Sequence, residues 1–174
     1  MAVVTPKSSA ITNADATPRV LNARIVDEGS LRESVATLEG ANGDSIASIF
    51  RMVRVKSSDR VSRVLLSCDA ISTSGAADVG IYRTADDGGA VVDVDFFASA
   101  VVLTSALVHS DITHEADAAD AGAGYGLADV EKPLWQALGL TTDPAVEYDI
   151  ALTLTAALGG AGTLSLKVQY VNNA

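Results

Sequence analysis

The clearest strand pattern in the chain is Val-Glu-Tyr-Asp-Ile-Ala-Leu-Thr-Leu-Thr-Ala, residues 146–156. Apolar residues alternate here with polar or small ones at a period of two, which is typical of a strand with one buried face. After a loop at 157–161, the alternation returns in Thr-Leu-Ser-Leu-Lys-Val-Gln-Tyr, residues 163–170. We expect the two strands to pair as an antiparallel hairpin, with Leu152 opposite Leu166. The apolar face of such a pair predicts a second layer that covers it.

Composition limits the class of protein. The chain has 174 residues, 48% of them hydrophobic, which suits one domain with its own core. The single cysteine, Cys68, cannot form an internal disulfide, and its apolar neighbours at a period of two predict that it points inward. We find no signal peptide and no apolar run of about 18 residues, so we expect folding in a reducing cytosol and no membrane partner. The net charge of -10 argues against nucleic acid as a direct partner.

The amino-terminal segment differs from the rest of the chain. Residues 1–30 carry prolines at positions 6 and 18 and show no sustained period of two or 3.6. We therefore expect an extended N-terminal arm at 1–30 that binds a partner, followed by a sandwich domain at 31–174. In the alternative interpretation, Val3-Val4 and Val20-Leu21 complete an edge strand of the sandwich.

Turn signals divide the middle of the chain. Two β-prone runs, 31–38 and 45–55, flank Asn42-Gly43, which predicts a hairpin between them. A second hairpin is predicted at Asp86-Asp-Gly-Gly89, between strands at 77–83 and 91–95. Further elements are predicted as follows: a strand at 61–69, a short helix at 96–103 capped by Asp95, a strand at 107–115, a mobile loop at 116–126 and a short helix at 133–138 that ends at Gly139.

Short strands at roughly 8–12-residue spacing indicate the fold class. We predict an all-β, antiparallel β-sandwich, with a jelly roll as the preferred topology and one or two short helices.

Candidate chemical sites are few. His109 and His114 are five residues apart, which places them on opposite faces of a strand, so a shared metal ion is disfavoured. A group of four aspartates could bind calcium through their carboxylate oxygens, although it lacks the spacing of a calcium-binding loop. We favour the interpretation that these aspartates lie on a solvated turn and a solvated strand face. This group contains Asp86, Asp87, Asp93 and Asp95.

Two further features have a structural and a functional interpretation. The glycines at 122–126 lack the βαβ context of a nucleotide site, so flexibility explains them better. Trp135 could anchor a partner, but a plug over one end of the sandwich is favoured. We therefore predict no catalytic, cofactor-binding or metal-binding residue.

Several stretches resemble the capsid cement, or decoration, proteins of tailed bacteriophages, of the jelly-roll type. They are Leu-Arg-Glu-Ser-Val-Ala-Thr-Leu-Glu (31–39), Ala-Asn-Gly-Asp-Ser-Ile (41–46), Gly-Ala-Ala-Asp-Val-Gly-Ile-Tyr (75–82), Asp-Phe-Phe-Ala-Ser-Ala (95–100) and Glu-Lys-Pro-Leu-Trp-Gln-Ala-Leu (131–138). The resemblance extends from about Lys7 to Val171.

This resemblance implies a non-enzymatic virion structural protein, assembled in the host cytoplasm, that lies on the capsid surface. Its expected partners are the major capsid protein, whose neighbouring subunits it would clamp, and further copies of itself in a homo-oligomer, a dimer or trimer. One alternative is a neck or tail component. Another is a carbohydrate-binding or hydrolytic jelly roll. Such a site needs aromatic platforms or a pair of carboxylates in a cleft, and the chain has only one tryptophan and four tyrosines.

Overall fold

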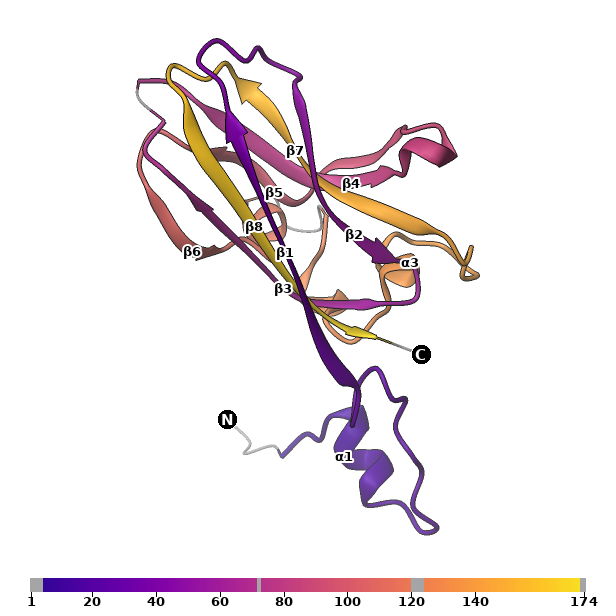
Figure 1. Ribbon diagram of the computed structural model, residues 1–174. Helices are drawn as coiled ribbons and strands as arrows, with labels where there is room; N and C mark the ends of the chain where they lie inside the picture. The colour runs from indigo at the N-terminus through magenta and orange to yellow at the C-terminus, as the bar shows by residue number, and fades with distance from the viewer. Residues whose placement is uncertain (1–4, 72, 120–123, 173–174) are drawn as a thin grey trace.

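The computed structural model describes residues 5–71, 73–119 and 124–172, and its main feature is a pair of four-stranded antiparallel sheets (Figure 1). One sheet has the strand order β1-β8-β3-β6 and the other has the order β2-β7-β4-β5. The strands are β1 (Ser30–Gly40), β2 (Ile49–Lys56), β3 (Arg60–Cys68), β4 (Ala76–Arg83), β5 (Val91–Val102), β6 (Leu107–Asp111), β7 (Glu147–Ala156) and β8 (Gly162–Asn172).

The order of the strands defines the topology. The first strand pairs with the last, and β4 and β5 are the only consecutive strands that pair within one sheet among the described residues. Each of the other connections crosses from one sheet to the other. This is the arrangement of an eight-stranded jelly roll, so the predicted all-β antiparallel sandwich is confirmed.

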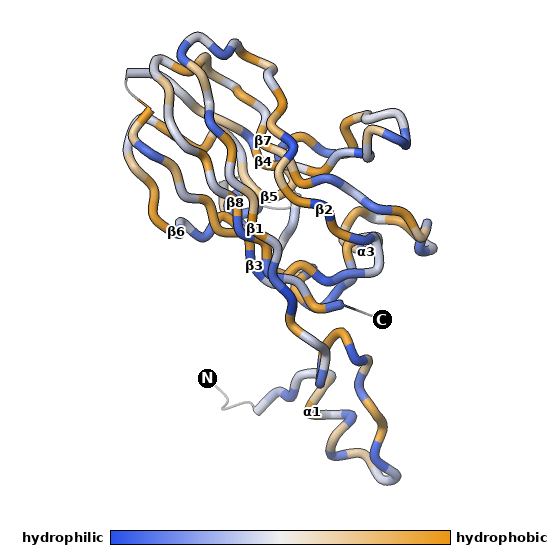
Figure 2. The backbone as a smooth tube through the Cα atoms, viewed as in Figure 1, coloured by the Kyte–Doolittle hydropathy of each residue, from blue (hydrophilic) through white to orange (hydrophobic). Residues whose placement is uncertain are grey.

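The core lies between the two sheets, and burial alternates most regularly along β8. In β8, Leu164, Leu166 and Val168 are fully buried, whereas the intervening side chains are partly exposed. In β7, Leu152 and Leu154 are likewise buried, and apolar segments of both strands lie in the interior (Figure 2). The face predicted to be buried in these strands is confirmed. The opposite face of β7 is less exposed than predicted, because Asp149 and Ala151 are buried as well. The prediction that Cys68 points inward is also confirmed, and burial raises the pKa of its thiol.

The predicted hairpin between residues 146–156 and 163–170 is wrong. The loop at 157–161 exists, but it carries the chain to the other sheet, where β8 pairs with β1 and β3. Leu152 lies opposite Phe50 and Val79, whereas Leu166 lies opposite Ala36 and Leu66. Both arrangements bury the same alternate residues, because the two sheets turn their apolar faces toward one core.

Of the other two predicted hairpins, one is wrong and one is confirmed. A turn follows β1, and Gly43 has the positive φ of +90° that its type permits, but β1 and β2 belong to different sheets. By contrast, β4 and β5 pair as predicted through a turn in which Gly88 and Gly89 have positive φ.

The predicted helix at 96–103 is wrong, because residues 96–102 belong to β5. The strand pairs irregularly with β4, with three shifts of register, and this lets the consecutive residues Phe96 and Phe97 both be buried. Their rings cluster with Tyr125, with centroids 5.1–5.7 Å apart. The β5 backbone also lies so close to Gly80 that a Cβ there would come within 2.2 Å of the Asp93 carbonyl oxygen.

The helices are short. The predicted helix at 133–138 is confirmed as α3 (Leu134–Ala137), which ends before Gly139 with its φ of +75°. The predicted strand at 107–115 stops at Asp111, and α2 (Glu115–Ala119) occupies the start of the predicted loop. Residues 120–123 of that loop lie outside the described residues. Single 3₁₀ turns occur at Ala85–Asp87 and Leu127–Asp129. None of the described helices is long and apolar enough to cross a membrane.

Candidate interaction surfaces

The arm contains a helix, contrary to the expectation of a segment without regular structure. Helix α1 (Ser9–Ala14) begins after Ser8, whose hydroxyl accepts a hydrogen bond from the Ile11 N–H at 3.3 Å. The chain then folds back, since the amide of Asn13 donates to the side-chain oxygen of Asn22 at 2.9 Å, and the Val20 N–H donates to the Asn13 carbonyl at 3.1 Å. Residues 8–22 therefore form a closed unit, which we call the hook, and it lies below the sandwich (Figure 1).

Within the described residues, the segment that follows the hook connects it to the sandwich. Arg60 on β3 donates a hydrogen bond of 2.6 Å to the carbonyl of Ile25, whose own side chain is buried. Residues 5–20 contain no buried side chain. Val20 and Leu21, which the alternative interpretation placed in an edge strand, lie outside every described strand, whereas Val3 and Val4 are not among the described residues.

The hook exposes apolar side chains. Ile11, Val20 and Leu21 are 51%, 50% and 82% exposed. Each alone would be ordinary at a protein surface, but together they lie on a small element that has no core of its own. A surface of this kind gains stability when a partner covers it, so the hook is the first candidate interaction surface.

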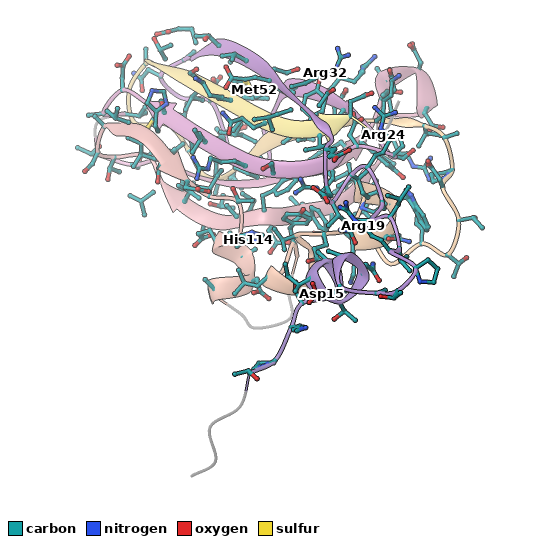
Figure 3. All side chains as sticks on the ribbon, turned by 90° about the horizontal axis from the view of Figure 1, so that it is seen from below. Asp15, Arg19, Arg24, Arg32, Met52 and His114 are labelled. Atoms are coloured by element: carbon teal, nitrogen blue, oxygen red, sulfur yellow. The ribbon has the colours of Figure 1, made fainter. Side chains whose placement is uncertain are left out.

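Charge is divided unevenly along the chain. Residues 1–60 carry eight basic and seven acidic side chains, whereas residues 61–174 carry four basic and fifteen acidic ones. Arg19, Arg24 and Arg32 all lie in the same half of the view in Figure 3. A hollow of about 230 Å³ is lined by Arg32, Arg54 and Lys56 together with the acidic Asp59 and Glu147, among other residues. Residues 1–60 are therefore less acidic than the rest of the sequence, and the hollow brings charges of both signs together.

The predicted acidic group is only partly assembled. Asp93 and Asp95 lie together on β5, and burial, followed by the neighbouring Asp95 carboxyl, raises the pKa of Asp93. Asp87 instead forms an ion pair with Arg83 at 2.7 Å. Asp86 lies with Asp87 in the turn that precedes β5.

Asp78, a carboxylate that the sequence did not single out, lies near Asp95 and near a further carboxylate, Glu115. Asp78 accepts a hydrogen bond of 2.7 Å from the Ala100 N–H, and Glu115 accepts one of 2.6 Å from the Ser99 N–H. These bonds satisfy backbone groups that the irregular pairing of β5 leaves free. No local signal in the sequence could have linked Asp78 to Glu115, because they come from β4 and α2.

The two histidines have separate environments. His109 is on β6, where its backbone N–H donates a hydrogen bond to the Ser67 hydroxyl at 2.9 Å. The ring of His114 stacks on Tyr125 at 5.2 Å, and its Nδ1 lies 2.8 Å from the Tyr125 carbonyl oxygen. Within the described part of the chain, no three His, Cys, Asp or Glu side chains are grouped so that they could hold a metal ion.

The structure also shows the surroundings of Gly124 in the glycine stretch and of Trp135. Gly124 has a φ of +58°, and a Cβ there would lie 2.3 Å from the Phe96 carbonyl oxygen, so this glycine permits a close approach of two backbones. Leu134 is fully buried in the core, whereas Trp135 is only partly buried. For Trp135, the plug over one end of the sandwich stays the favoured prediction and the partner anchor stays its alternative.

Comparisons with known proteins identify the fold. No protein-family model and no curated protein matches the chain. Among solved structures, a chain of the capsid of Ralstonia phage GP4 is similar over 83% of this chain and 85% of that chain, with a TM-score of 0.53 and 12% identity. A chain of the Cyanophage Pam1 capsid asymmetric unit covers 82% of this chain and 85% of its own length, with a TM-score of 0.41 and 11% identity. The first comparison shows that this jelly roll shares its fold with a chain found in a phage capsid structure.

Proposed function

We propose that this protein is a non-enzymatic structural component of a phage virion. More specifically, it is a cement protein that binds the outer surface of the capsid and stabilises contacts between major capsid subunits. The observation that carries the proposal is the fold shared with a chain of a phage capsid over more than four fifths of both chains. The resemblance of the sequence to cement proteins points to the same role.

The hook supplies a physical mechanism for attachment. Its exposed apolar side chains Ile11, Val20 and Leu21 would be removed from water against a capsid subunit, which stabilises a complex by roughly 25 cal/mol per Å² of apolar surface. Because the hook is already closed by the Asn13–Asn22 hydrogen bond, less conformational entropy is lost on binding than for a disordered arm. The sandwich then acts as a rigid body that holds the neighbouring subunits.

The experiment that tests this function is reconstitution on particles that lack the protein. Purified full-length chain is added to such particles, which are then sedimented, and the bound fraction is measured against concentration. We expect saturable binding and a higher temperature of capsid disruption. A chain with Ile11→Ser, Val20→Ser and Leu21→Ser should bind at least tenfold more weakly.

A matched control separates the hook from general surface hydrophobicity. Val91 and Val92 on β5 are 55% and 40% exposed, and their double substitution by serine should leave binding unchanged. Equal binding of all three chains would contradict the role of the hook. Failure of the wild-type chain to bind would contradict the cement function itself.

A further inference from the structure

The four edge strands of the sandwich are not alike. A free strand edge can pair with another chain, and proteins protect such edges with bulges, short strands or proline. The pairing of β2 is interrupted by a shift near Met52, the pairing of β5 has three shifts, and β6 is only five residues long. By contrast, β1 pairs with β8 over eleven consecutive residues without any shift, and it contains no proline. Among the edges, only that of β1 is both long and regular.

The surroundings of β1 are open as well. Leu31 and Val35 point away from the core and are 61% and 57% exposed. On the inner side, Ser34, Ala36 and Leu38 are only partly buried, so the sandwich is not closed along this edge. For residues 30–39, the ladder with β8 supplies the only backbone hydrogen bonds recorded within the described residues. The outer backbone groups of β1 are therefore available to another strand.

The sequence of β1 fits a second copy of itself. An antiparallel pair that uses all eleven residues is centred on Val35, which then lies opposite the Val35 of the other copy. In this register Leu31 lies opposite Glu39, and Glu33 lies opposite Thr37, so that no two like charges are directly opposed. If the two-fold axis passed through Ala36 instead of Val35, Glu33 of one copy would lie opposite Glu39 of the other, and two like charges would meet. The charge pattern thus favours the full-length register.

We propose that two copies of this protein associate by antiparallel pairing of β1 with β1 about a two-fold axis at Val35. The four-stranded sheet of each copy then continues into an eight-stranded sheet across the dimer. The pairing satisfies the free backbone groups of both edges and buries Val35 and the half-open side of each sandwich. The inference goes beyond the proposed function, since it specifies an interface that forms in the isolated protein.

The test is site-directed disulfide formation. Directly opposite residues in an antiparallel pair have Cα atoms about 4.5–5.5 Å apart, which is within the range that a disulfide spans. In a Cys68→Ala background, Val35→Cys should give a covalent dimer under mild oxidation. Val108→Cys, on the β6 edge of the same sheet and 80% exposed, is the matched control and should stay monomeric.

Two further variants test the register. Leu31→Cys alone should not cross-link, whereas Leu31→Cys combined with Glu39→Cys should, because these two positions face each other across the axis. Equal cross-linking of the Val35→Cys and Val108→Cys chains would overturn the proposal, as would cross-linking by Leu31→Cys alone.

Sedimentation equilibrium gives a measurement that needs no cysteine. The wild-type chain should be a dimer, and Val35→Asp, which brings two carboxylates together at the axis, should weaken the dimer at least tenfold while leaving the melting temperature of the fold unchanged. A wild-type chain that stays monomeric at about 100 μM would refute the interface, even if the chain binds particles. In that case, loss of particle binding by Val35→Asp would assign the β1 edge to a capsid subunit instead.

Discussion

Arg51 on β2 donates a hydrogen bond of 3.0 Å to the buried carboxylate of Asp149 on β7. The same guanidinium donates to the carbonyl oxygens of Arg83 and Gly89, each at 2.7 Å, and lies over the ring of Tyr82. One side chain thereby joins β2 and β7 to the turn between β4 and β5. The outer face of this sheet is held by a polar network in which Asp149 is the shared acceptor.

Asp149→Ala should therefore destabilise the fold. Arg54 also donates to Asp149, at 2.8 Å, so the substitution removes charge-assisted hydrogen bonds from two arginines. We expect a loss of about 2 kcal/mol, which corresponds to a melting temperature lower by about 4–8 °C in a domain of this size. Asp87→Ala, which removes an exposed ion pair with Arg83, is the control and should change the melting temperature by no more than about 2 °C.

The same network predicts a pH dependence. Burial alone would raise the pKa of Asp149, but the hydrogen bonds from Arg54 and Arg51 outweigh it, so the pKa lies below its ordinary value of 3.8. A carboxyl with a lowered pKa in the folded state contributes stability that is fully present above that ordinary value. This contribution is lost as the pH falls through the lower, folded pKa.

Denaturant unfolding of the wild-type chain and of Asp149→Ala between pH 2 and pH 7 measures this pH dependence of stability. The difference in unfolding free energy should be constant at neutral pH and should shrink below about pH 4. A difference that grows in acid would mean that Asp149 is not stabilised as an anion.

The buried face of β7 gives a further prediction. Leu152 is fully buried between the sheets, so Leu152→Asp places an unpaired charge in the core and should unfold the domain at 25 °C. Thr155 is exposed and serves as the control, because Thr155→Asp adds the same charge on the same strand. Thr153 is less suitable, since its hydroxyl is hydrogen-bonded to that of Tyr82. If circular dichroism showed the two variants melting alike, the assignment of the faces would be wrong.

Periodicity predicted the core-facing residues of β7 and β8, but neither the burial of Asp149 and Ala151 on the opposite face of β7 nor which strands pair. The alternation in β7 and β8 is the same whether they form a hairpin or face each other across a core, because either arrangement buries Leu152 and Leu166. Asn42-Gly43 likewise predicted a turn, and the turn exists, but a turn at the end of a sandwich can join two sheets as readily as two paired strands. Pairing depends on long-range contacts, which no local pattern encodes.

The misassigned helix has a different cause. Phe96, Ala100 and Leu103 have helical spacing, yet the segment is an irregular strand because Phe96 and Phe97 both fill the space beside Tyr125. Tertiary packing overrides a weak local preference here. The candidate surfaces were predictable only in part. The prolines and the missing periodicity of residues 1–30 indicated the arm. The sequence alone does not show that β1 lies at an edge, because this depends on which strands pair.

Deletion of residues 2–20, which removes most of the hook, should leave the sandwich intact. Residues 5–20 have no buried side chain, and the segment around Ile25 that contacts β3 is retained when residues 2–20 are deleted. We expect thermal unfolding of the shortened chain within about 2 °C of the full-length chain. A decrease of more than about 8 °C would mean that the segment belongs to the fold.

The location of the protein in the particle distinguishes a cement protein from a neck or tail component. Intact virions are labelled with a gold-conjugated antibody against this chain and imaged by electron microscopy, with particles that lack the protein as the control. For a cement protein, we expect label distributed over the whole outer surface of the capsid. Label confined to the neck or tail would contradict the cement function.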